Sequence, residues 1–90
     1  MQNYEKKIVR DFITQLRYIY LNSALSDNEK QERAFGCYLG STNVCKALFS
    51  ESHYVEIADV MLSVFDLATC DYRIGYDIDV KEYCEAYNLN

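Results

Sequence analysis

The chain has no proline and no tryptophan, and only three of its 90 residues are glycine. Proline interrupts helices and glycine weakens them, so their scarcity favours long helices with few sharp turns. No apolar run approaches the ~20 residues that a membrane-spanning helix needs. The amphipathic opening "MQNYEKKIVRDF" also lacks the apolar segment of a secretory signal. We therefore expect a cytoplasmic all-α protein that makes no membrane contact.

Residues for zinc binding and nucleophilic catalysis are also scarce. His53 is the only histidine, and no two of the four cysteines form a C-x-x-C pair. We expect Cys37, Cys45, Cys70 and Cys84 to be small, buried, reduced side chains. His53 stands at the start of a predicted helix, where we expect a capping or solvated residue.

Positive charge is scarce in the second part of the chain. Residues 51–90 hold two Lys/Arg and nine Asp/Glu, a balance of −7, whereas residues 1–50 have a balance of +2. Phosphate backbones are bound by Lys and Arg, so direct nucleic-acid binding is not expected. The acidic half suits a basic protein, a divalent cation, or the basic half of a second copy. A merely solvated acidic surface is the alternative.

Apolar periodicity predicts four main helices in one domain, residues 1–90. The first spans about residues 3–22, and the third runs from a cap at Ser52 to about Cys70. Ser26 and Glu29 form a capping box that starts the second helix near Asp27. The fourth, in "VKEYCEAYN", begins behind Asp79. We expect a compact all-α bundle with antiparallel neighbours that dimerises or forms a higher homo-oligomer.

The second helix is interrupted by two glycines four residues apart, Gly36 and Gly40. Each lowers helix propensity by up to ~1 kcal/mol relative to alanine. Two arrangements stay open at this point: one continuous helix with a kink, or two short helices that meet at Gly40.

The third helix, which contains "EIADVMLSVFDLA", is apolar around most of its circumference. Its polar residues form a narrow stripe: His53, Glu56, Asp59, Ser63 and Asp66. If protein surrounds this stripe, its carboxylates need a cation, hydrogen-bond donors or basic partners, because burying an unpaired charge is costly. If the stripe faces water, it needs no partner.

This helix and the residues after it resemble a known family. "EIADVMLSVFDLA", a glycine-containing loop and "IDVKEYCEAYN" are similar to the second half of the MazG-like all-α nucleoside triphosphate pyrophosphohydrolases. The similarity covers about residues 54–88. The resemblance implies a MazG-like helical fold in which E-x-x-E and E-x-x-D pairs bind Mg²⁺ for attack of water on a phosphate. Carboxylates three residues apart share one side of a helix, and oxygen ligands suit Mg²⁺.

The match to these acidic pairs is incomplete. Glu56 and Asp59 correspond to the second pair and are the candidate metal ligands. Asn43 and Lys46 occupy the positions of the first pair, where a lysine would repel the cation. The resemblance therefore implies an internal polar contact, in which Lys46 pairs with the two carboxylates.

A second E-x-x-E pair offers weak candidates for the missing ligands. Glu29 and Glu32 precede Glu56 at a separation similar to that in the family. They have no apolar flank to orient them inward, and they suit the positive end of a helix dipole. We therefore rank them below Glu56 and Asp59.

The C-terminal region combines tyrosines with carboxylates. Tyrosine is a good interface residue because it is large and stiff and has one polar tip. The predicted partner-binding surface consists of Tyr72, Tyr76, Asp77, Asp79, Glu82 and Tyr83. Half-burial of these tyrosines against a small core is the alternative.

Three functions follow from these features. We favour a non-catalytic protein that binds or inhibits a basic, nucleic-acid-handling protein through its acidic, tyrosine-rich surface. Small acidic proteins of phages and mobile elements are similar in size and charge. The first alternative is a pyrophosphohydrolase with Glu56, Asp59 and a Mg²⁺ cofactor; without that activity we expect no cofactor. The second is a helical assembly or regulatory subunit with no separate ligand.

Overall fold

The computed structural model describes residues 1–70, 84–86 and 88–89. Three long helices account for most of these residues: α1 (Asn3–Tyr20), α2 (Asp27–Leu48) and α3 (Glu51–Cys70). A short helical turn covers residues 84–86. The all-α prediction is confirmed. Of the four main helices that we expected, the described residues contain three and this turn.

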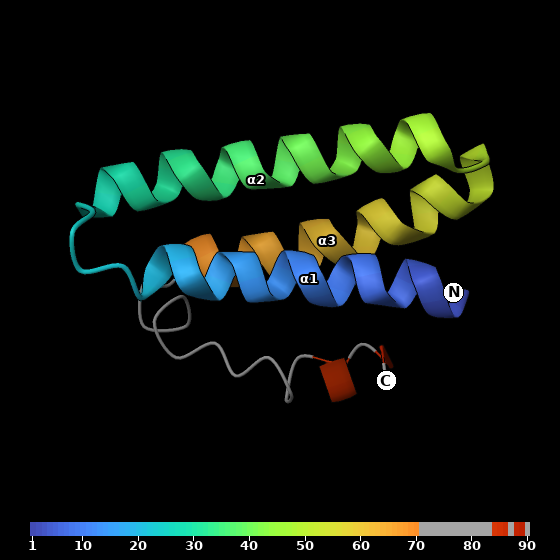
Figure 1. The fold of residues 1–90 in the computed structure, drawn as a ribbon, viewed down its shortest axis with the longest axis horizontal. Coiled ribbons are helices and arrows are strands. Elements are labelled where there is room, and N and C mark those ends of the chain that lie inside the picture. Colours follow the sequence, from blue (N-terminus) through green and yellow to red (C-terminus); the bar gives the residue numbers. More distant parts are fainter. Residues whose placement is uncertain (71–83, 87, 90) are drawn as a thin grey trace.

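The three helices form a bundle in which α2 packs along α1 and α3 and runs in the opposite direction to both (Figure 1). Helix α1 buries one side, on which Val9, Phe12, Ile13 and Leu16 recur at three- and four-residue steps. It ends at Tyr20, two residues earlier than predicted. The amide of Leu21 still donates to the carbonyl of Arg17, 3.0 Å away, and the turn to α2 follows.

Helix α2 starts at the predicted capping box. The Ser26 hydroxyl accepts from the Glu29 amide at 3.2 Å, and the Glu29 carboxylate accepts from the Ser26 amide at 3.1 Å. These bonds satisfy two backbone donors that would otherwise lack partners at a helix start. The helix then continues through Gly36 and Gly40, so the continuous alternative holds.

A short connection joins α2 to α3. Phe49 is extended, with φ −117° and ψ 158°, which ends α2. The Tyr54 amide donates to the Ser50 carbonyl at 2.9 Å, so Ser50 occupies the capping position. The predicted cap at Ser52 is therefore wrong, and Ser52 lies inside the first turn of α3.

The core lies between the three helices, and the chain end also contributes to it. Ile57, Met61 and Val64 of α3 are fully buried against the apolar side of α1. The Tyr38 ring stacks on Phe65 with centroids 5.0 Å apart and joins α2 to α3. Leu89 is fully buried, and its carbonyl accepts a hydrogen bond from the guanidinium of Arg10.

Candidate interaction surface and buried carboxylate

The carboxylates predicted to bind metal lie on the outside of α3. The Glu56 side chain is 52% exposed, and its Oε1 lies 3.2 Å from the N-terminal ammonium of Met1. Asp59, one turn further along, is also exposed. Within residues 1–70, 84–86 and 88–89, no three His, Cys, Asp or Glu side chains are grouped to hold a metal ion. Glu56 and Asp59 therefore lie on the solvent-facing side of α3.

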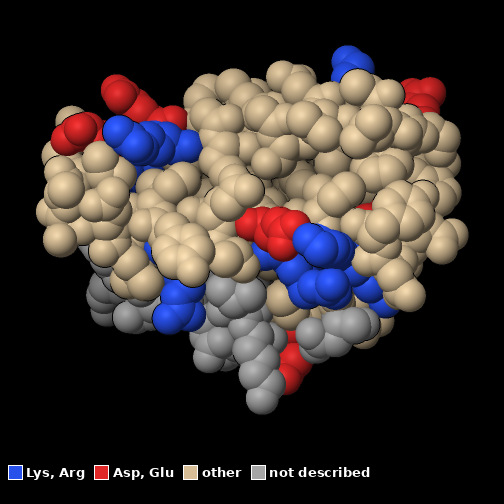
Figure 2. Space-filling view, in the orientation of Figure 1, with Lys and Arg blue, Asp and Glu red and all other residues tan. Residues whose placement is uncertain are grey.

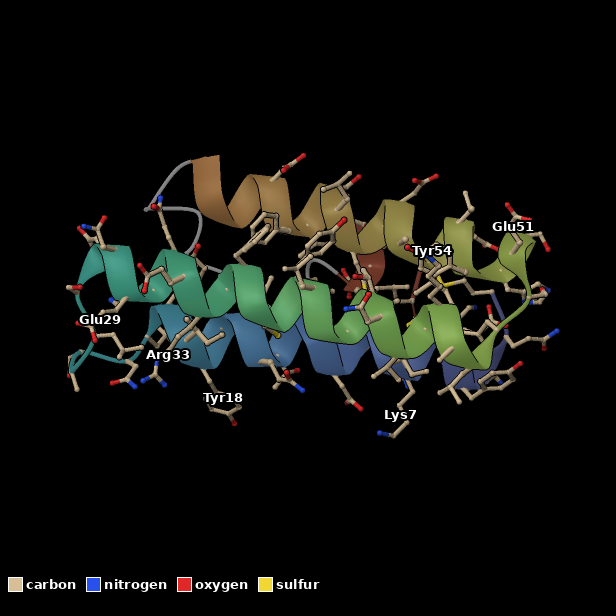
Figure 3. All side chains as sticks on the ribbon, turned by 90° about the horizontal axis from the view of Figure 1, so that it is seen from above. Lys7, Tyr18, Glu29, Arg33, Glu51 and Tyr54 are labelled. Carbon is tan, nitrogen blue, oxygen red and sulfur yellow. The ribbon has the colours of Figure 1, made fainter. Side chains whose placement is uncertain are left out.

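The weaker ligand candidates, Glu29 and Glu32, do not join this pair. Both lie in the opening turns of α2, and Glu29 and Glu51 mark opposite ends of the bundle in Figure 3. The Glu29 carboxylate is engaged by the Ser26 amide, and this hydrogen bond holds the pKa of the carboxyl below its ordinary value. Glu29 therefore serves as a helix cap.

The internal contact predicted for Asn43 and Lys46 is also wrong. Both side chains are exposed on α2. The cation that pairs with Glu56 is the ammonium of Met1 and not the side chain of Lys46. Lys46 instead borders a surface pocket that it shares with Glu51 and Val55 of α3.

The predicted tyrosine and carboxylate surface lies outside the described residues. This holds for all six of its members: Tyr72, Tyr76, Asp77, Asp79, Glu82 and Tyr83. The acidic character of the second half of the chain is nevertheless visible on α3. Glu51, Glu56, Asp59 and Asp66 are all exposed, and residues 51–70 contain no Lys or Arg.

Apolar side chains interrupt these acids on the outer side of α3. Val55 is 47% exposed and Leu62 is 42% exposed. With Asp59 and Asp66 they recur at steps of four, three and four residues, which places them in one stripe along the helix. We call Val55, Glu56, Asp59, Leu62 and Asp66 the α3 stripe. It combines negative charge with exposed apolar area on a rigid element.

A buried carboxylate lies beside the first turn of α3. Glu5 of α1 has no exposed surface, and its Oε1 lies 2.7 Å from His53 Nδ1 on α3. A carboxylate can only accept, so Nδ1 carries the hydrogen. This bond holds the pKa of Glu5 below its ordinary value and outweighs burial, which acts in the opposite direction. His53 is therefore only partly solvated, and it does not cap the helix as expected but binds a buried carboxylate.

The surroundings of Glu5 are largely apolar. Its Oε2 is buried and accepts no hydrogen bond from the described residues. The Cys45 thiol is also buried here, and burial and the charge of Glu5 both raise its pKa. The Cys84 thiol is buried as well. The Cys37 thiol is half-buried, and its own burial raises its pKa. All three thiols are free, as predicted; the prediction of burial is confirmed for Cys45 and Cys84, whereas Cys37 is only half-buried.

Comparison of the chain with protein families, with curated proteins and with solved structures finds no match. The resemblance to the MazG-like enzymes therefore stays a prediction based on residues 54–88. Among the helices that the structure describes, none is long and apolar enough to cross a membrane.

Proposed function

We propose that this chain is a non-catalytic interaction protein that binds a basic protein through the α3 stripe. The observation that carries the proposal is the composition of α3. Its exposed side has carboxylates and apolar residues in one line, and the helix carries no Lys or Arg. The partner that fits is a protein segment whose apolar side chains are flanked by Lys and Arg.

Charge complementarity supports this choice of partner. Helix α1 holds four Lys/Arg and two Asp/Glu, α2 holds three of each, and α3 holds four Asp/Glu and no Lys or Arg. Negative potential therefore gathers on one helix instead of being spread over the surface. Such a field speeds association with a basic surface and disfavours approach of nucleic acid. By covering a basic groove, the chain would inhibit a nucleic-acid-handling protein.

The apolar residues of the α3 stripe would supply binding energy that its charges alone do not. Exposed ion pairs contribute little to affinity, typically about 0–1 kcal/mol each. Burying a leucine or valine side chain contributes roughly 1.5–3 kcal/mol. Leu62 and Val55 therefore provide affinity, and Asp59 and its neighbours provide orientation and selectivity.

A labelled helical peptide with leucines flanked by lysines tests the partner class directly. We expect it to bind the full chain, with an affinity that falls as salt concentration rises. Neutralising three acids of the stripe (Glu56→Gln, Asp59→Asn, Asp66→Asn) should weaken binding at least about tenfold. The matched control neutralises three acids elsewhere (Asp11→Asn, Asp27→Asn, Glu32→Gln) and should bind as the parent chain does.

Three outcomes would contradict the proposal. The first is absence of binding, and the second is an equal loss in the two triple variants. The third is Mg²⁺-dependent release of pyrophosphate from nucleoside triphosphates that Glu56→Gln abolishes, which would establish the enzymatic alternative.

A further inference from the structure

Helix α2 exposes four large apolar side chains, whereas the side chains that it buries most completely are small or polar. Its buried residues are Lys30, Ala34, Thr42 and Cys45. Phe35, Leu39, Val44 and Leu48 are between 42% and 66% exposed. Tyr38 packs on the core, and the Phe35 ring lies 6.2 Å from that of Phe65 on α3, so Phe35 is at the margin of the exposed side. A helix with a single contact surface normally buries its largest apolar residues. The outer side of α2 therefore has the composition of a second contact surface.

The same side carries no charge along its middle. Residues 34–45 contain no Asp, Glu, Lys or Arg. Figure 2 shows an uncharged expanse over α2, with charged side chains toward its two ends. Covering the middle of this surface would require no charged group to lose water, which avoids a large cost of forming a contact. Two molecules of net charge −5 would bring no like charges together along the middle of this surface.

Apart from Lys46, the exposed residues between positions 35 and 48 form two rows with a step of four. The first row is Phe35, Leu39, Asn43 and Ala47, and the second is Gly36, Gly40, Val44 and Leu48. The first row has its large side chains toward the start of α2, and the second has them toward its end. A Cβ added at Gly36 or Gly40 would meet nothing within 4 Å, so both glycines are open recesses in the surface.

We propose that this side of α2 binds the same side of a second copy, with the two α2 helices antiparallel. In a pair centred between Ser41 and Thr42, the start of one helix faces the end of the other. Phe35 then lies opposite Ala47 of the second copy. Rows with a step of four are the ones that interlock most often between packed helices.

We choose a second copy over another protein because the large and small side chains of α2 fit each other when two α2 helices run in opposite directions. The second row places Gly40 opposite Val44 of the second copy, and Gly36 opposite Leu48 of the second copy. In each row, large side chains of one copy therefore lie opposite small side chains of the antiparallel copy. The dimer would present two α3 stripes, although it rests on α2 alone and does not depend on the proposed function.

Two exposed leucines allow a matched test by sedimentation velocity across micromolar concentrations. Leu39 on α2 and Leu62 on α3 are each 42% exposed. We expect the parent chain to dimerise and Leu39→Glu to raise the dissociation constant at least about tenfold. Leu62→Glu adds the same charge and should leave it unchanged. A parent chain that is monomeric throughout, or an equal loss in both variants, would overturn the proposal.

The antiparallel arrangement has its own test. It places position 39 of one copy opposite position 43 of the other, whereas a parallel pair sets each position opposite itself. Mixing Leu39→Glu with Asn43→Lys should therefore give a heterodimer tighter than either variant forms alone. Circular dichroism checks that both exposed substitutions leave the helices intact. A mixture no tighter than its components would overturn the antiparallel arrangement.

Discussion

His53 Nδ1 lies 2.7 Å from Oε1 of Glu5, and this bond joins the start of α3 to a fully buried carboxylate of α1. The His53 side chain is 42% exposed, so the pair spans from solvent to the interior. Because Oε2 of Glu5 accepts no bond from the described residues, His53 is the main compensation for this buried charge.

Removing the imidazole should destabilise the fold more than its partial exposure suggests. His53→Ala leaves the Glu5 carboxylate buried without its hydrogen-bond donor, which costs the desolvation energy of the group. We expect the urea midpoint at pH 7 to fall clearly. Ser52→Ala is a suitable control, because it removes an exposed neighbour on the same turn. Equal midpoints for the two variants would show that His53 does not stabilise the carboxylate.

The stabilising effect of the Glu5 charge should disappear in acid. The folded-state pKa of Glu5 lies below its ordinary value of 4.5, so the unfolded chain takes up the proton first as pH falls. The contribution is therefore complete above the ordinary value and is lost as pH drops through the folded-state pKa. Comparing Glu5→Gln with the parent chain in urea between neutral and acid pH isolates this carboxyl. A difference that stays constant down to acid pH would contradict the shift.

The capping box should be worth about 1 kcal/mol to the free energy of unfolding, as Ser and Thr caps usually are. Ser26→Ala removes the hydroxyl that accepts from the Glu29 amide. It also removes a hydrogen bond that lowers the pKa of Glu29. Chemical denaturation of this variant should therefore show a loss that Ser23→Ala, in the preceding exposed turn, does not share. Similar losses in both variants would mean that the cap has no specific role.

The last residues should contribute to the core despite their position at the chain end. Leu89 is fully buried, so Leu89→Ala should lower the free energy of unfolding by about 2–5 kcal/mol. Leu21→Ala provides the comparison, because that leucine is 49% exposed. Urea denaturation at equal protein concentration measures both. A loss below that of Leu21→Ala would contradict the packing of Leu89.

Local sequence rules predicted the helices well and the surfaces less well. The spacing of Ser26 and Glu29 marked the start of α2 correctly, because a capping box depends only on residues three apart. The Glu5–His53 pair joins residues 48 positions apart, and nothing local in the first helix distinguishes Glu5 from a solvated acid. The outward direction of Asn43 and Lys46 depends on how α2 is rotated against α3. Apolar residues all around α2 leave that rotation undetermined by its own pattern.

The substitution Gly40→Ala should affect folding and self-association in opposite directions. A Cβ at this position meets nothing within 4 Å in the single chain, and alanine raises helix propensity by up to about 1 kcal/mol. The monomer should therefore become more stable. In the antiparallel dimer the new methyl group would fill the recess opposite Val44 of the second copy, so sedimentation should show weaker association. Adding Leu39→Glu to Gly40→Ala provides the control, because the stabilisation should persist where no dimer forms. If Gly40→Ala instead strengthened association, the recess would not be where the second copy packs.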